Sequence, residues 1–302
     1  MEHRSNGVLF MKSAPNTPVL QHSNTPSASA DLHLHTTHSD GTFSPQRLVA
    51  EAKACGLACM SLTDHDTVNG IVETAALAKA AGIEFIPGIE LTAHIDEREF
   101  HVLAYFPNSE GWNDPGFRGE IRKFSDARVE RIHKTVAKLN AVGVDIKTEE
   151  IFAISGMGAP GRLHIARALM DGGHVNSVDD AFSRYLRKGQ PGFAPKFRIG
   201  AQDAIALIHR YKGVAVFAHP GIAGLDHRIE DFVGWGLDGV EVWHSKHRPR
   251  DVKRYQEIAS RHSLLLTGGS DCHGMAKEQI LIGGVKLTYE HVEKLKAHKP
   301  GA

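Results

Sequence analysis

The sequence has few cysteines and no long apolar run. Its 302 residues include three cysteines, Cys55, Cys59 and Cys272, which form no Cys-x-x-Cys pair. An odd cysteine count argues against a disulfide framework, so we expect a reducing, cytoplasmic location. No apolar run approaches the roughly 18 residues that a membrane-spanning helix needs, and we therefore expect no membrane segment.

The sequence also lacks a net charge. It carries 35 Lys and Arg residues against 35 Asp and Glu residues. This balance argues against extended coating of a nucleic acid, but it is compatible with a local basic pocket for a phosphorylated ligand, because steering depends on where charges lie. With 41% hydrophobic and 23% charged residues, the composition is that of an ordinary globular protein.

Two common phosphate-binding loops are absent. No Gly-x-Gly-x-x-Gly follows a predicted strand, as dinucleotide-binding folds require, and no Gly-Lys-Ser/Thr loop occurs. The first 29 residues are rich in Ser, Asn, Pro and Thr, and they lack the continuous apolar segment of a secretory signal. We expect a disordered leader over residues 1–29.

From residue 30 onward, short apolar runs alternate with amphipathic stretches, the pattern of repeated strand–helix units. Strands are expected at 30–35, 58–63, 83–90, 100–106, 214–218, 239–243 and 264–267, with helices at 46–54, 71–81, 201–211 and 250–262. About seven strands favour an α/β barrel over an open nucleotide-binding sheet. We therefore predict one barrel over residues 30–302.

The strand–helix alternation stops at about residues 113–200. This stretch has helical patterns at 117–141, 148–154, 162–170 and 178–187, and no convincing strand between them. We interpret it as a helical cap inserted into the barrel.

Histidine is abundant, with 20 residues, and imidazole is the commonest metal ligand. His33 and His35 are two apart in a predicted strand, so both side chains project from one face. Asp40 follows on the turn beside Gly41. In this arrangement both histidines could bind the same metal ion, although two histidines at a strand edge can also have a purely structural role.

Acidic residues and histidines recur where other predicted strands end. Barrel enzymes place their catalytic groups at the carboxyl ends of strands. Each residue alone could cap a helix or end a strand, but capping does not require histidine at so many strand ends. The residues in question are Asp64, His65, Asp66, Glu90, His101, His219, Asp271 and His273.

Together, these motifs resemble the polymerase-and-histidinol-phosphatase (PHP) family. The resemblance runs from about residue 30 to about 285 and rests on Asp31-x-His33-x-His35, Thr63-Asp64-His65-Asp66, Gly88-Ile89-Glu90, Ala218-His219-Pro220 and Ser270-Asp271-Cys272-His273. It implies a distorted seven-stranded barrel that holds two or three divalent ions.

The resemblance also implies a ligand set for each ion. The first ion would be bound by His33, His35, Glu90 and Asp271, the second by Glu90, His101 and His219, and the third by Asp40, His65 and His273. Glu90 would then bridge the first two ions.

Mixed imidazole and carboxylate ligands suit Mn²⁺, Zn²⁺ or Fe²⁺ better than Ca²⁺ or Mg²⁺, which prefer oxygen. Mn²⁺ is the first expectation. Such ions bind phosphate and lower the pKa of a bound water, so the set predicts a phosphoesterase. Asp64 and Asp66 flank a ligand, and we expect them to support the ligands rather than bind metal directly.

The predicted insertion offers cations for a second phosphate. Arg162 and Lys196 lie near glycine or proline turns, and Arg forks match phosphate oxygens bidentately. An exposed helix face is the structural alternative. The segments around Arg162 and around Trp243-His244-Ser245 resemble a stand-alone nucleotide-cleaving subgroup, which implies that Ser245 and His247 also contact substrate.

That subgroup hydrolyses the 3′-phosphate of 3′,5′-bisphosphonucleotides, and some members trim short RNA from the 5′ end. The expected partner is therefore a phosphorylated nucleotide or a short RNA. One alternative is a histidinol-phosphate or other small-molecule phosphatase on the same scaffold. An alternative of another class is a non-catalytic, metal-binding regulatory domain.

Overall fold

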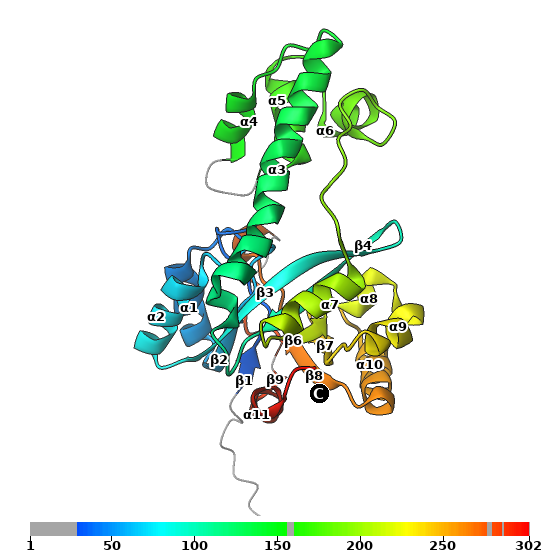
Figure 1. The fold of residues 1–302 in the computed structure, drawn as a ribbon. Coiled ribbons are helices and arrows are strands. Elements are labelled where there is room, and N and C mark those ends of the chain that lie inside the picture. Colours follow the sequence, from blue (N-terminus) through cyan, green and yellow to red (C-terminus); the bar gives the residue numbers. More distant parts are fainter. Residues whose placement is uncertain (1–28, 156–159, 277–279, 286, 302) are drawn as a thin grey trace, which may run out of the picture.

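The computed structural model describes residues 29–155, 160–276, 280–285 and 287–301. A sheet wrapped by helices forms the larger part, and a helical lobe stands on one side of it (Figure 1). The leader predicted over residues 1–29 lies outside the described residues, except for Ser29, which begins the first strand.

The sheet curls into a nearly closed α/β barrel. Within the described residues its strands run in the order β8-β7-β6-β4-β3-β2-β1-β9, and β5 pairs with β3. The strands are β1 (Ser29–Asp31), β2 (Leu57–Leu62), β3 (Glu84–Ile95), β4 (Arg98–Tyr105), β5 (Ile199–Gly200), β6 (Val214–Phe217), β7 (Gly239–His244), β8 (Leu265–Gly269) and β9 (Leu287–Thr288). The two-residue strands β5 and β9 raise the count above the seven expected.

The chain closes the ring just beyond β1 and β8. The main-chain N–H of Leu32 donates to Gly268 (3.1 Å), and that of Asp271 donates to His33 (2.9 Å). The two backbones approach so closely that a Cβ on Gly269 would lie 2.4 Å from the His33 nitrogen. The strand expected over residues 30–35 is therefore regular only as far as Asp31, because its second half makes these irregular bonds.

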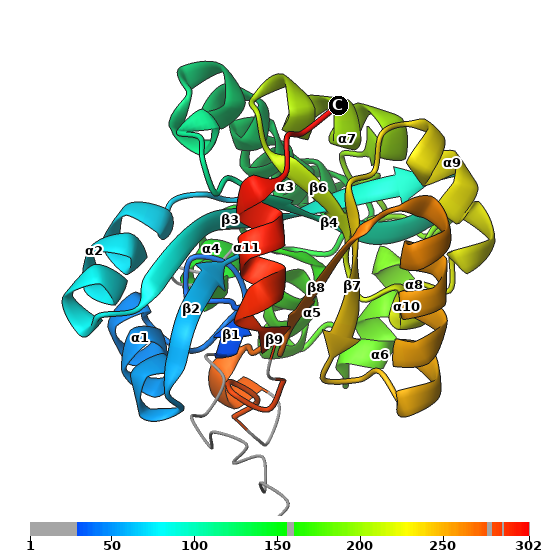
Figure 2. The ribbon, with the colours of Figure 1, turned by 90° about the horizontal axis from the view of Figure 1, so that it is seen from below.

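Helices cover the outside of the barrel. They are α1 (Pro45–Ala54), α2 (Ile71–Ala81), α7 (Ala201–Arg210), α8 (Pro220–Ala223), α9 (Ile229–Gly234), α10 (Pro249–His262) and α11 (Tyr289–Ala297). The Ser44 side chain accepts from the Arg47 N–H to cap α1, and Gly82 ends α2 in the left-handed conformation. Seen from below, α11 crosses the end of the barrel opposite the lobe (Figure 2), where it packs on β1, β2, β8 and β9.

The helical lobe contains α3 (Pro115–Ala141), α4 (Thr148–Ser155), α5 (Arg162–Asp171) and α6 (Val178–Ala181), followed by a π-helical turn at Phe182–Leu186. Phe117 and Ile121 of α3 belong to the main hydrophobic core beside the sheet. Ile132 and Leu139 belong to a separate core inside the lobe. A single helix is therefore built into both cores and sets the position of the lobe.

None of the described helices combines the length and the apolar character that crossing a membrane requires.

Candidate metal centre

The predicted ligands converge at the end of the barrel that faces the lobe. His33 and His35 follow β1, and His65 follows β2. Glu90 lies in β3 and His101 in β4. Asp40 lies on the loop between β1 and α1, and the remaining ligands follow β6 and β8: His219, Asp271 and His273.

The set predicted for the first ion is gathered in one buried cluster. The Nε2 atom of His33 lies 3.1 Å from Glu90 Oε2, and that of His35 lies 3.2 Å from the same oxygen. His35 Nε2 is also 3.3 Å from Asp271 Oδ1. These four side chains can offer one ligand atom each within 4.8 Å of one another.

A second cluster collects the residues predicted for the third ion. Asp40 Oδ1 lies 3.2 Å from His273 Nε2 and 4.0 Å from His65 Nε2. His35 joins this group through its Nδ1, 4.0 Å from the same carboxylate oxygen.

The residues predicted for the remaining ion surround the other oxygen of Glu90. Oε1 lies 2.8 Å from His101 Nδ1 and 2.9 Å from His219 Nε2. His65 approaches the opposite oxygen, with its Nδ1 3.2 Å from Glu90 Oε2, and it can offer a ligand atom close to those of Glu90 and His101. Each oxygen of Glu90 therefore faces its own set of imidazoles, the arrangement that a bridging carboxylate needs. The shared position of His65 was not expected from the sequence.

The donors at this end of the barrel fit divalent cations. Both ring nitrogens of His35 are buried and make no hydrogen bond within the described residues, although carboxylate oxygens of Glu90 and Asp271 lie just over 3 Å from Nε2. Lone pairs that point toward a common centre, rather than toward donors, are expected of metal ligands. Imidazole nitrogens with carboxylate oxygens are typical ligands of transition-metal dications.

Charge coupling inside the cluster is strong. Burial alone would raise the pKa of Glu90, but the imidazoles of His65, His101 and His33 hold that pKa well below its usual value. Burial alone would lower the pKa of His33, but Glu241 and Glu90 outweigh burial and raise the pKa well above its usual value. The carboxylates therefore favour a positive charge at His33, which a proton or a bound cation can supply.

Backbone strain accompanies the sharp turns at the strand ends. Asp66, His219 and Asp271 all have positive φ angles, of 52°, 29° and 53°. Such conformations cost free energy in non-glycine residues and cluster at functional sites. Here they turn the chain directly after β2, β6 and β8.

Glu241 is a supporting residue that the sequence interpretation missed. Its Oε1 lies 2.9 Å from Nδ1 of His33, and its Oε2 accepts the main-chain N–H of His219 (2.7 Å). One carboxylate thus orients two predicted ligands, a common arrangement around metal-binding imidazoles. The available signal was a carboxylate between Val240 and Val242, in a stretch whose other residues from Gly239 to Trp243 carry no charge.

Asp31 and His244 also support the cluster. Asp31 accepts the main-chain N–H of Ser270 (2.9 Å), and burial raises its pKa to about 6. His244 Nε2 lies 3.4 Å from Asp271 Oδ2. Asp31 lies in a motif that carries the family resemblance and His244 in one that carries the subgroup resemblance, but neither was predicted as a site residue.

Asp64 accepts hydrogen bonds from a neighbouring loop, and Asp66 accepts them from strand β3. Asp64 accepts from the main chain of Thr36 (2.7 Å) and from the Ser39 hydroxyl (2.6 Å), so it orders the loop that carries Asp40. Asp66 accepts from the main chain of Thr92 (2.9 Å).

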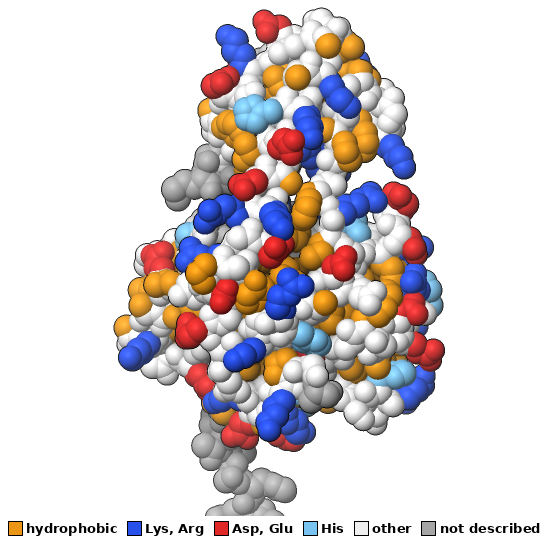
Figure 3. All heavy atoms as spheres, in the orientation of Figure 1, with side chains coloured by type: hydrophobic (Ala, Val, Ile, Leu, Met, Phe, Trp, Pro, Cys, Tyr) orange, Lys and Arg blue, Asp and Glu red, His pale blue; other side chains and the backbone are white. Residues whose placement is uncertain are grey.

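Two adjoining cavities lie between the barrel and the lobe. The first, of about 290 Å³, is lined by ligands of the metal clusters. The second, of about 180 Å³, lies toward the lobe. Both are lined by Glu99, Arg128 and Lys196, so the two cavities share a wall. Figure 3 shows Lys and Arg side chains on the surface where the lobe joins the barrel.

The second cavity, which we call the basic cavity, brings together the cations predicted from the sequence and two that were missed. Arg162 and Lys196 line it, as do Arg128 and Arg131 of α3. The two missed arginines lie in a long charged helix, whose sequence does not reveal which face meets a cavity.

Ser245 and His247 are placed differently. Ser245 is exposed, and neither residue lines the two cavities. His247 Nδ1 pairs with the carbonyl of Val242 (2.8 Å), and its Nε2 accepts the N–H of Gly221 (3.2 Å). Both nitrogens of His247 are thus engaged with the main chain, and substrate contact by these two residues stays a prediction.

Comparison with known proteins agrees with this geometry. The PHP domain model matches residues 31–187. A 3′,5′-nucleoside bisphosphate phosphatase of Chromobacterium violaceum is 31% identical over 254 residues, which cover 82% of this chain and 87% of the relative. A 5′-3′ exoribonuclease of Haemophilus influenzae is 32% identical over 248 residues, 80% of this chain and 89% of the relative.

A solved structure is also similar. A Bifidobacterium adolescentis protein named as a metal-dependent phosphoesterase superposes with a TM-score of 0.70 at 30% identity, and the match covers 89% of this chain and 96% of the other. With the ligand cluster in place at the end of the barrel, these matches show that the chain belongs to the PHP domain family and is a PHP-type phosphoesterase.

Proposed function

We propose that this phosphoesterase cleaves a phosphate ester on a ribose that carries a second phosphate. The 3′-phosphate of a 3′,5′-bisphosphonucleotide is the first expected substrate. The observation that carries the proposal is the wall shared by the metal-ligand cavity and the basic cavity. One phosphate would react beside the metal ligands while the other is bound by the cations of the lobe.

The names of the two relatives support a common chemistry. One acts on nucleosides with phosphates at the 3′ and 5′ positions, and the other degrades RNA from its 5′ end. Both names describe cleavage of a phosphate ester in a molecule that has a 5′ end. A remote site for a 5′-phosphate would therefore serve a bisphosphonucleotide and a short 5′-phosphorylated RNA alike.

Divalent ions would be bound by the predicted ligands, with Mn²⁺ the first expectation and Zn²⁺ or Fe²⁺ the alternatives. Bound there, they would supply charge for the phosphoryl oxygens and lower the pKa of water. Glu241 would keep His33 in the tautomer that leaves Nε2 free for an ion, because Nδ1 then carries the proton shared with the carboxylate. Asp64 would hold the loop that carries Asp40.

Parallel assays test the proposal. Purified protein supplied with Mn²⁺ would be offered adenosine 3′,5′-bisphosphate, a short 5′-phosphorylated RNA, adenosine 3′-monophosphate and histidinol phosphate. We expect kcat/KM for the bisphosphate to exceed that for either monophosphate by about 10-fold or more, since a charged hydrogen bond contributes roughly 1.5–3 kcal/mol. Equal or faster turnover of histidinol phosphate would favour a small-molecule phosphatase instead.

A further inference from the structure

One face of α3 lines the basic cavity. Phe124, Ala127, Arg128 and Arg131 follow the three- and four-residue spacing that places side chains on one side of a helix, and all four border the cavity. The cavity is closed on the other side by Arg162, at the start of α5, and by Lys196. Cations thus face the cavity from three separate segments of the lobe.

The four cations are not equally neutralised. Arg128 lies 2.7 Å from Asp66, and Lys196 lies 2.8 Å from Glu99. Arg131 and Arg162 have no ion pair with a carboxylate in the part of the chain that the structure describes. The Arg162 guanidinium instead lies over the Phe182 ring, 5.4 Å from its centroid. Two arginines therefore border the cavity with uncompensated charge.

Arg131 is fixed in a way that suits anion binding. Its Nε donates to the main-chain carbonyl of Ala194 (3.0 Å), which orients the planar guanidinium while the two terminal NH₂ groups make no hydrogen bond within the described residues. A guanidinium group whose orientation is already fixed loses less conformational entropy when it binds a ligand. Burial and the charges of Arg162 and Arg128 lower the pKa of Arg131 to about 10, a repulsion that a bound anion would relieve.

We propose that Arg131 is a specificity-determining residue, whose terminal NH₂ groups bind the remote phosphate of the substrate together with Arg162. This inference rests on the proposed function. Two unpaired guanidinium groups match a terminal phosphate monoester, which carries nearly two charges, better than an internal diester with one. The pocket then selects a phosphorylated chain end over a site within a chain.

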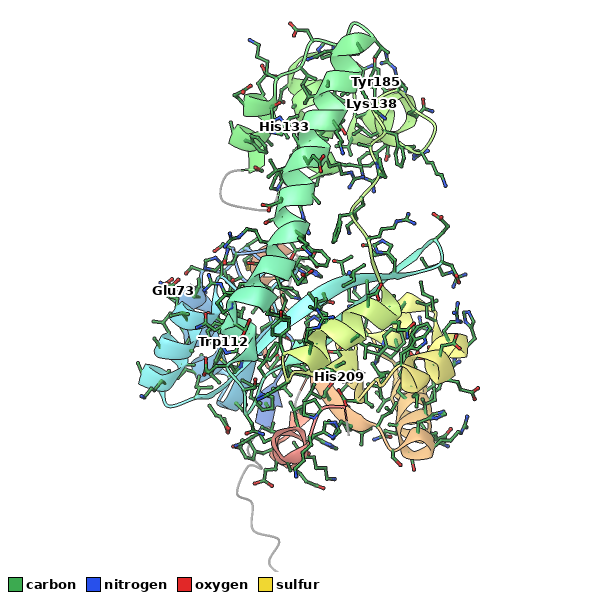
Figure 4. All side chains as sticks on the ribbon, in the orientation of Figure 1. Glu73, Trp112, His133, Lys138, Tyr185 and His209 are labelled. Carbon is green, nitrogen blue, oxygen red and sulfur yellow. The ribbon has the colours of Figure 1, made fainter. Side chains whose placement is uncertain are left out.

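A purely structural role for Arg131 is the competing interpretation. Its bond to Ala194 tethers the segment that returns from the lobe to the barrel. Lys138, two turns further along the same face of α3, makes the same kind of bond to the carbonyl of Phe193 (2.6 Å). Lys138 lies in the lobe (Figure 4) and does not line the basic cavity. It therefore provides a matched control for the tether alone.

The experiment compares wild type, Arg131→Ala, Arg131→Lys and Lys138→Ala with Mn²⁺ supplied. The substrates are adenosine 3′,5′-bisphosphate and adenosine 3′-monophosphate. We expect Arg131→Ala to lower the ratio of kcat/KM for the bisphosphate to that for the monophosphate by about 10- to 100-fold, mainly through KM. Arg131→Lys should lower the ratio less, because a point charge replaces the fork, and Lys138→Ala should leave it at the wild-type value.

The proposal is overturned if Arg131→Ala slows both substrates equally, or if Lys138→Ala lowers the ratio as much as Arg131→Ala does. An unchanged ratio in both Arg131 variants overturns it as well. If Arg131→Ala fails to fold, Arg131→Lys carries the test, since it keeps the charge and the aliphatic stem. Failure of the proposed function is distinguishable, because wild type itself would then show no preference for the bisphosphate.

Discussion

At the scale of single residues, the candidate metal centre is organised by carboxylates that each have several partners. Glu90 faces imidazoles with both of its oxygens, and Glu241 holds His33 from the opposite side of the ring. Removing such a carboxylate leaves buried partners unpaired, which costs more than the bond itself contributes. Glu241 is the more informative of the two, because it binds the predicted ligands and does not belong to the predicted ligand set.

Glu241→Gln is expected to weaken metal binding while preserving the fold. The amide keeps the size and one acceptor of the carboxylate, but it loses the charge that holds the His33 ring. Changes to such supporting groups typically reduce metal affinity about 10- to 100-fold. Metal content after dialysis against a weak chelator, with Glu293→Gln as an exposed control, measures the effect. Wild-type metal retention in Glu241→Gln would contradict the supporting role.

At the scale of secondary-structure elements, the helices were easier to predict than the strands. The helix at Ile71–Ala81 was predicted with its observed bounds, because apolar spacing and the stop at Gly82 mark both ends. The four helical segments of residues 113–200 are present for the same reason. The two-residue strand β9 and helix α11 were missed, because short pairings and a mostly polar final helix leave little periodic signal.

The residues of the candidate site were also only partly predictable from the sequence. Histidines and acids at strand ends could be recognised from spacing, and the structure brings them together. Glu241 could not be placed without knowing which face of β7 meets His33. Arg128 and Arg131 could not be placed either, because contacts between the lobe and the barrel are set by tertiary packing rather than by local pattern.

Two glycine-to-alanine substitutions are expected to change the stability of the fold in opposite directions, one where the barrel closes and one in helix α3. In Gly269→Ala the new Cβ would meet the Cβ and main-chain nitrogen of His33 at 2.3 and 2.4 Å, so we expect a loss of roughly 1–3 kcal/mol in the free energy of unfolding. In Gly119→Ala, within α3, the new Cβ would meet nothing within 4 Å, and the helix should gain about 0.5–1 kcal/mol. Urea unfolding checks both, and a neutral Gly269→Ala would argue against the close approach.

At the scale of the whole molecule, the predicted metal ligands are distributed around the circumference of the barrel. They come from the ends or bodies of β1, β2, β3, β4, β6 and β8. Bound cations would therefore tie strands that are far apart in the sequence, and ligands that bind only the folded state stabilise it.

Metal removal should make the stability of the molecule depend on alkaline pH. The pKa of His35 is raised to about 9, because Asp271 and Glu90 outweigh the effect of burial. A histidine whose pKa is higher in the folded state stabilises the protein below its unfolded pKa of about 6.5, and that contribution is lost as pH rises toward 9. Thermal unfolding in a chelator should thus show a falling Tm between about pH 6.5 and 9.

Loading with Mn²⁺ should raise the Tm and remove most of this slope, since an ion replaces the proton on the imidazole. Measuring Tm over the same pH range with bound Mn²⁺ and with chelator provides the comparison. A metal-free protein with a flat Tm from pH 6.5 to 9 would show that these histidines are not held protonated by their carboxylate neighbours.

The segment of α3 that enters the lobe has a further consequence for how the protein can change over evolutionary time. All four cations of the basic cavity come from residues 128–196, whereas every predicted metal ligand comes from outside that stretch. Under the roles proposed for these two sets, mutation, insertion or recombination within this one continuous segment would alter substrate recognition without changing the predicted metal ligands. A lineage of such proteins would then diversify its substrates while inheriting a single, unchanged reaction.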